Sequence, residues 1–362
     1  MRFFSGFLLF AAFSFFAGAL CGQELGGARG TFLEIAKRYE VAEQHPAPAW
    51  THRKDKPLFR IAWLSDMHIT TPEGMERHKK LLTQIRKDLK PVAVFFTGDS
   101  WGIGADDAER SKTFRQFLDL CLGKKGEKGY VKAVAIPGDN WPSGFETAFA
   151  SRQVAFTLGG FRFIAFAPDR GGKKNGCTLH SQDSLRWLED ELNYAAISDQ
   201  PVIYIQHEPL LPPSTLDAPK IAMMLDKAPQ VFLALGGHLH LDLEFTNGHW
   251  RQWVCPSSGH SHRPGFKLLS FYPDCVIAQA WEEDPKEKGE FRAVSKYLRA
   301  PIPLQCRGDL FSVKTYDPED VSRRAHLPYL EDPDLDAEVD LVTNAMVDYA
   351  LRYVIQRYRD KK

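Results

Sequence analysis

Short apolar runs alternate with amphipathic segments through the middle of this chain. Four runs have almost no polar position: Phe59–Ser65, Val92–Thr97, Val202–Gln206 and Val231–Gly236. Such runs are typical of strands buried on both faces of a sheet. A further strand is expected at Val131–Ile136, and helical spacing predicts helices at Met75–Leu89, Ala108–Leu122 and Gln182–Ala196. The order of strands and helices indicates an α/β fold.

A second set of segments predicts antiparallel strands. Gln153–Leu158 and Phe161–Ala167 flank Gly159-Gly160, which is a strong hairpin signal. Later short strands are expected at Leu243–Thr246, Arg251–Cys255, Lys267–Phe271 and Val276–Trp281. Two packed sheets covered by helices account for the whole pattern.

Acidic and imidazole side chains follow the four apolar runs. Their motifs are Asp66-Met67-His68, Gly98-Asp99, His207 and Gly237-His238-Leu239-His240. The ends of strands in an α/β sheet are where ligands bind. Two Asp and three or more His gathered there would repel one another or be poorly solvated unless positive charge lay between them. The motifs therefore predict a pair of divalent metal ions, with alternate residues of each strand end facing the same site.

These motifs, in this order, resemble the calcineurin-like metallophosphoesterases, which hydrolyse phosphate esters with two metals. The resemblance runs from about Phe59 to Trp281 and implies a four-layer αββα sandwich. It also implies that Asp66, His68 and His240 join a bridging Asp99 around one metal, while His207 and His238 join it around the other. Nitrogen and oxygen ligands without cysteine suit Mn, Fe or Zn.

One motif departs from the family pattern. Where the family has Gly-Asn-His, this chain has Gly138-Asp139-Asn140-Trp141. In direct register Asp139 replaces the metal-binding Asn and Asn140 replaces the His that resembles a general acid. With a one-residue insertion, Asn140 is the ligand and Trp141 takes the place of that His. Neither register restores a histidine.

A missing proton donor slows the departure of a poor leaving group without abolishing two-metal chemistry. Candidate replacements are His260, His262, His180 and Glu208. We carry Asp99, Asp139, Asn140 and His262 forward as catalytic candidates. The metal ligands predicted are Asp66, His68, Asp99, Asp139 or Asn140, His207, His238 and His240.

Charge and composition limit the partners. The 362 residues carry 46 basic and 46 acidic side chains, so nothing in the net charge favours nucleic acid or an anionic membrane. Residues 1–21 are typical of a signal peptide, which predicts export and no stable membrane span after cleavage. Cys21 permits lipid anchoring, but Leu20 and Gly18 do not fit the usual lipoprotein pattern, so simple export is preferred.

The expected organisation is a signal peptide (1–21), an N-terminal segment and linker (22–57), a metallophosphoesterase domain (58–282) and a C-terminal extension (283–362) with a terminal helix, Leu335–Arg359. The predicted function is hydrolysis of a small phosphomonoester or phosphodiester by a metal-bridged hydroxide, with an activated diester preferred because the usual proton donor is absent. The alternative is a catalytically weak homologue that binds a ligand through its metals.

Overall fold

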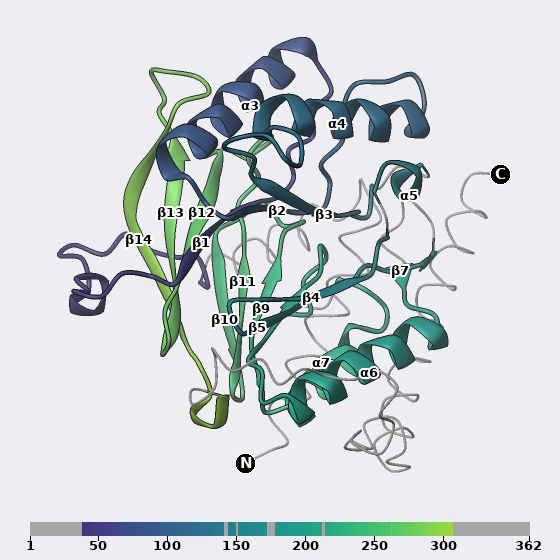
Figure 1. Cartoon of the computed structure of the whole chain (residues 1–362), viewed down its shortest axis with the longest axis vertical. Helices are drawn as coiled ribbons and strands as arrows, with labels where there is room; N and C mark the ends of the chain where they lie inside the picture. Colours follow the sequence, from purple (N-terminus) through teal and green to yellow (C-terminus); the bar gives the residue numbers. More distant parts are fainter. Residues whose placement is uncertain are drawn as a thin grey trace.

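Two six-stranded sheets pack face to face, with helices on both outer surfaces (Figure 1). The computed structural model describes residues 38–140, 144–149, 151–171, 178–211, 214–261 and 263–306. The first sheet has the order β14 (Phe291–Pro301), β13 (Cys275–Glu283), β12 (Gly265–Phe271), β1 (Phe59–Leu64), β2 (Ala93–Thr97), β3 (Lys132–Ile136). The second has the order β10 (Leu243–Asn247), β11 (Trp250–Val254), β9 (Val231–Gly236), β8 (Val202–Ile205), β5 (Phe161–Ala165), β4 (Val154–Leu158). A small third pair, β6 (Arg170–Gly171) and β7 (Thr178–Leu179), lies beside them.

Alternation along each central strand explains the continuous apolar runs. In β1, Ile61 and Trp63 face the core between the sheets, whereas Ala62 and Leu64 face the helices of the outer layer. In β8, Ile203 and Ile205 likewise face the inner core. Each strand therefore buries both faces, as the sequence predicts.

The helices form the two outer layers. On the first sheet lie α3 (Pro72–Gln84), which continues into a π-helical turn at Ile85–Leu89, α4 (Asp107–Leu122) and the short α5 (Phe145–Ala148). On the second sheet lie α6 (Gln182–Ile197) and α7 (Ala218–Lys227). N-caps fix where α3, α4 and α6 begin, because the side chains of Thr71, Asp106 and Ser181 each accept a hydrogen bond from the backbone amide three residues on. Single-turn 3-10 helices lie at Ala49–Thr51 and Leu304–Cys306.

The four-layer αββα sandwich is confirmed, and several elements were not expected, of which strand β14 and helix α7 are the longest. Strand β14 pairs with β13 beyond residue 282, the expected end of the domain, and buries Leu298 and Ala300 in the core between the sheets. Its charged residues, such as Arg292 and Lys296, hid the strand pattern. Helix α7 was also missed. The expected signal peptide and terminal helix lie outside the described residues.

Parallel strands direct their carboxyl ends toward one region. Strands β1, β2 and β3 run parallel in the first sheet, and β5, β8 and β9 run parallel in the second. The loops that leave these ends meet where the two sheets adjoin. No helix in the described ranges is long and apolar enough to cross a membrane.

Candidate metal centre

Hydrogen bonds that involve the backbone join the loops of both sheets. Within the first sheet, the amide of His68 donates to the carbonyl of Asp99 (3.1 Å). Between the sheets, the amide of His238 donates to Asp66 Oδ2 (3.0 Å) and His207 Nδ1 lies 2.7 Å from the carbonyl of Thr97. The predicted ligands, which come from five separate loops, therefore gather in one cluster.

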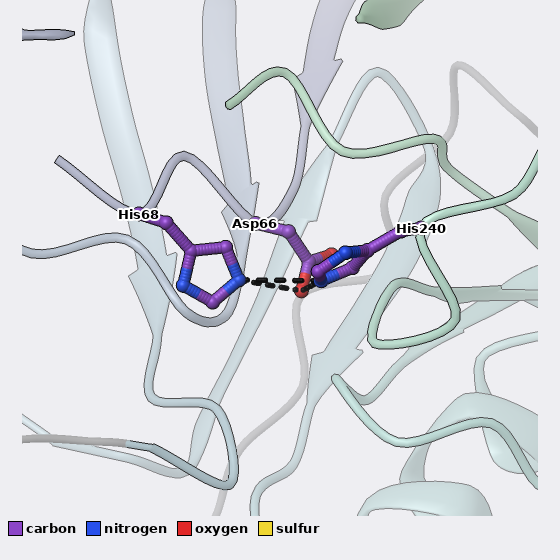
Figure 2. A group of neighbouring side chains, drawn as sticks. All are labelled: Asp66, His68 and His240. Atoms are coloured by element: carbon purple, nitrogen blue, oxygen red, sulfur yellow. Dashed lines mark hydrogen bonds and ion pairs between the residues drawn. The ribbon is translucent and has the colours of Figure 1, made fainter. Parts of the chain in front are cut away.

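The first group consists of Asp66, His68 and His240 (Figure 2). Asp66 Oδ1 lies 3.2 Å from His240 Nε2 and 3.6 Å from His68 Nε2. The two Nε2 atoms are 3.2 Å apart. Both imidazoles thus point their Nε2 atoms toward the same carboxylate.

The second group consists of Asp139, His207 and His238. Asp139 Oδ1 lies 3.3 Å from His207 Nε2 and 3.2 Å from His238 Nδ1. In the direct register of the departing motif, Asp139 is the predicted ligand, and it is the residue that lies beside these two histidines.

Asp99 lies between the two groups. Its Oδ2 is 3.7 Å from His68 Nε2 in the first group and 3.7 Å from His207 Nε2 in the second. Asp66, Asp99 and His207 also form a third cluster of close ligand atoms, all buried. This is the position that a bridging carboxylate requires.

The ligands point inward for a different reason from the one expected. Asp66, His68, Asp99, His238 and His240 all have positive φ, between 44° and 65°. Non-glycine residues seldom adopt this left-handed conformation, which concentrates at functional sites. The expectation that simple strand alternation orients each pair was therefore wrong: the chain has already left the strand, and the left-handed turns aim the side chains.

Close packing explains two glycines in the motifs. A Cβ on Gly98, whose φ is +100°, would lie 2.3 Å from Nδ1 of His207. A Cβ on Gly138 would lie 2.1 Å from Oδ1 of Asp99. Any side chain at either position would displace a candidate ligand.

Unpartnered buried atoms test whether metals fit here. Because the Thr97 carbonyl can only accept, Nδ1 carries the proton when His207 is neutral, and Nε2 then presents a lone pair. His207 Nε2 and Asp66 Oδ1 are both buried and have no hydrogen-bond partner. Buried polar atoms are rarely left in this way, so the donor set fits two divalent cations.

The electrostatics support the same conclusion. Burial raises the pKa of Asp66, but His207, His240 and His68 outweigh it and hold the pKa well below its usual range. Burial lowers the pKa of His207, but Asp99 and Asp66 reverse this and raise it well above its usual range. Without cations His207 therefore tends to hold an extra proton, which a bound cation would replace.

Asn140 and the proposed acid replacements lie in different surroundings. The side chain of Asn140 donates from Nδ2 to Asp99 Oδ2 (3.0 Å). His260 is exposed, and its ring centroid lies 4.8 Å from that of His68, which also contacts Trp101. His180 is buried against Phe166 and pairs with Asp217 (3.0 Å). His262 lies outside the described residues.

Glu208 follows His207 and is completely buried. Its Oε1 accepts from the Thr178 hydroxyl (3.1 Å), and its Oε2 has no partner. Burial raises the pKa of Glu208 above its usual range.

Several supporting residues carry no sequence signal of their own. The Ser65 hydroxyl donates to Asp66 Oδ2 (2.6 Å), and the Ser257 hydroxyl donates to the Asp66 carbonyl (2.7 Å). The buried Lys267 on β12 pairs with Asp242, two residues beyond His240. Serines and single charges are too common for periodicity or spacing to mark them.

Two mixed sheets, whose parallel strands share an Asp/His cluster at their carboxyl ends, define a dimetal hydrolase architecture. Comparison with known proteins agrees: residues 59–242 match the calcineurin-like phosphoesterase family, and the chain belongs to that family. No curated protein matches the chain.

Solved structures resemble the fold at low identity. A dimetal phosphatase from Danio rerio is 13% identical, with a TM-score of 0.51, and the match covers 68% of this chain and all of that one. GAP50, described as the anchor in the inner membrane complex of Plasmodium, is 13% identical with a TM-score of 0.46 over 67% of this chain and 90% of that chain. At these identities the likeness concerns the fold alone.

Proposed function

We propose that this protein hydrolyses phosphate esters at the Asp/His cluster. The observation that carries the proposal is the position of Asp99, whose Oδ2 lies equally far from a histidine of each group. When bound, two divalent cations such as Mn, Fe or Zn would supply the positive charge that binds phosphoryl oxygens and activates water. Asp66, His68 and His240 would hold one, and Asp139, His207 and His238 the other, with Asp99 shared.

The residues of the chain itself hold this arrangement ready. The Ser65 hydroxyl and the His238 amide both occupy Asp66 Oδ2, which leaves Oδ1 directed at the histidines. The Thr97 carbonyl fixes the tautomer and ring orientation of His207. Such outer partners orient ligands before the substrate arrives, so little reorganisation is needed during the reaction.

The substrate proposed is a small phosphomonoester or phosphodiester, with an activated diester preferred. In direct register Asn140 replaces the family's acid residue, and an amide does not deliver a proton at neutral pH. The net charge of zero gives no reason to propose nucleic acid as a partner. We also propose export, on the strength of the signal-peptide pattern; the mature protein in an extracytoplasmic fraction, beginning after residue 21, would test it.

Hydrolysis of p-nitrophenyl phosphate and bis-p-nitrophenyl phosphate by metal-loaded protein tests the function. Turnover should be abolished by chelation and fall by at least about 10²–10³-fold in Asp99→Asn. The better substrate would identify the ester class. Bound metal without turnover on either ester would instead favour the alternative, a ligand-binding homologue, which the loss of the acid residue also favours.

A series of esters with increasingly poor leaving groups tests the missing donor. We expect the rate to fall steeply along the series, because a general acid typically contributes about 10²–10⁴-fold and matters most for poor leaving groups. His260→Ala provides the comparison. A steeper fall in this variant would identify His260 as the replacement donor, and an unchanged slope would exclude it. A flat series in the wild type would show that another donor is present.

A further inference from the structure

The two metal positions have nearly the same chemistry in this chain. Each combines one carboxylate with two imidazoles, and the shortest carboxylate-to-imidazole distance is 3.2 Å in both. Asp66 provides the carboxylate in the first position and Asp139 in the second. Asp99 lies at the same 3.7 Å from one histidine of each.

Asp139 gives the second metal position the same ligand charge as the first, one carboxylate of its own besides the shared Asp99. An asparagine in direct register would offer a neutral oxygen, which leaves Asp99 as the single negative ligand near the second cation. Asp139 adds a full negative charge there, and its Oδ1 lies within 3.3 Å of both histidines. Attraction between opposite charges at such distances is large where the protein limits solvent screening.

Asn140 acts on the shared carboxylate. Its backbone amide lies 3.1 Å from Asp99 Oδ1, and its Nδ2 lies 3.0 Å from Asp99 Oδ2, so it donates to both oxygens. Gly138 packs against the same carboxylate so closely that a Cβ would lie 2.1 Å from Oδ1. The loop that follows β3 thus holds the Asp99 carboxylate by two hydrogen bonds, while His68 and His207 lie near its Oδ2.

We propose that Asp139 and Asn140 divide two tasks: Asp139 is a charged ligand that makes the second metal position as strong as the first, and Asn140 is a positioning residue that fixes the bridging Asp99 for both. This inference rests on the part of the proposed function that assigns two metal ions to the cluster. It does not require that the protein hydrolyse esters. Outer partners of metal ligands typically change affinity by about 10–100-fold. The division explains why the chain retains a metal site while lacking the usual acid residue.

Calorimetric titration of chelator-treated full-length protein with Mn²⁺ tests the ligand role. Wild type should bind two equivalents of similar affinity. Asp139→Asn should weaken one equivalent by at least the roughly 10- to 100-fold that loss of an outer partner costs, and leave the other intact; the matched variant Asp66→Asn should do the same. The retained equivalent also shows that each variant is folded. Two unchanged equivalents in Asp139→Asn, or a single equivalent in wild type, would overturn the assignment.

The same titration tests the positioning role. Asn140→Ala should weaken both equivalents, because Asp99 contributes to both positions. Asn247→Ala is the matched control, since Asn247 Nδ2 also donates to a carboxylate, Asp226 Oδ1 (2.9 Å), at an exposed position on β10. An effect on one equivalent alone, or none, would overturn this role. Two tight equivalents without ester hydrolysis would reject the proposed function and leave the inference standing.

Discussion

The two sheets bring different chemistry to the candidate metal centre. Loops of the first sheet supply all three carboxylates, Asp66, Asp99 and Asp139, whereas loops of the second supply the imidazoles of His207, His238 and His240. His68 is the exception, an imidazole from the first sheet. The carboxylate half repels itself and the imidazole half has no negative charge, so neither binds two cations well alone. The site is therefore a property of the packed pair of sheets.

One buried ion pair joins these halves directly. Lys267 lies on β12 of the first sheet, and Asp242 lies just before β10 of the second. Lys267→Met should lower the free energy of unfolding by about 3–5 kcal/mol, because it leaves Asp242 buried without a partner. Denaturant unfolding measures this loss, which should be the largest of the three changes in stability that we predict.

Lys296→Met is the matched control for that change. Lys296 pairs with Glu282 at 2.6 Å, but both residues belong to the first sheet and Glu282 is 18% exposed. A smaller loss is expected, since water can reach the remaining carboxylate. Equal losses in the two variants would show that the ion pair between the sheets contributes no more to stability than one within a sheet. The double variant Lys267→Met with Asp242→Leu should recover much of the loss.

Sequence patterns revealed which residues meet but not how they are held. The buried runs of β1, β2, β8 and β9 could be recognised because both faces of each strand are apolar, and the polar motifs follow directly. The positive φ of Asp66 and the hydrogen bond from Asn140 to Asp99 could not be recognised from the sequence, because both depend on contacts between loops distant in sequence. Strand β14 was missed because its charged residues mask its pairing with β13.

Buried histidines inside and outside the site titrate in opposite directions. Carboxylates raise the pKa of His207, whereas burial lowers that of His78 on α3 to about 4. His78 Nδ1 donates to the Gly74 carbonyl (2.8 Å), and its Nε2 lies 3.4 Å from the Ser258 hydroxyl. It therefore folds in the neutral form.

A depressed pKa in the folded state makes stability depend on pH in one direction. The contribution of His78 is fully present above its ordinary pKa of 6.5 and is lost as the pH falls toward about 4. The loss should reach roughly 3 kcal/mol, since the shift in pKa acts only on the folded form. Denaturant unfolding of chelated protein at pH 7 and pH 4 should show a smaller difference in His78→Asn. The same difference in both proteins would contradict the assignment.

The smallest expected effect is the difference in stability loss between Gly98→Ala and Gly126→Ala. It separates packing between the loops of the two sheets from backbone strain. Gly98 and Gly126 have nearly the same φ, +100° and +97°. A Cβ on Gly98 would lie 2.3 Å from His207 Nδ1, whereas a Cβ on Gly126 would have nothing within 4 Å.

Gly126→Ala should therefore carry only the conformational penalty of about 1–2 kcal/mol. Gly98→Ala should carry about 1–3 kcal/mol more, because alanine forces His207 away from the Thr97 carbonyl. Denaturant unfolding of the two variants gives the difference, and Mn²⁺ titration should show weakened binding in Gly98→Ala alone. Equal stability losses with normal metal binding in both would mean that the loops of the two sheets can move apart without disturbing the site.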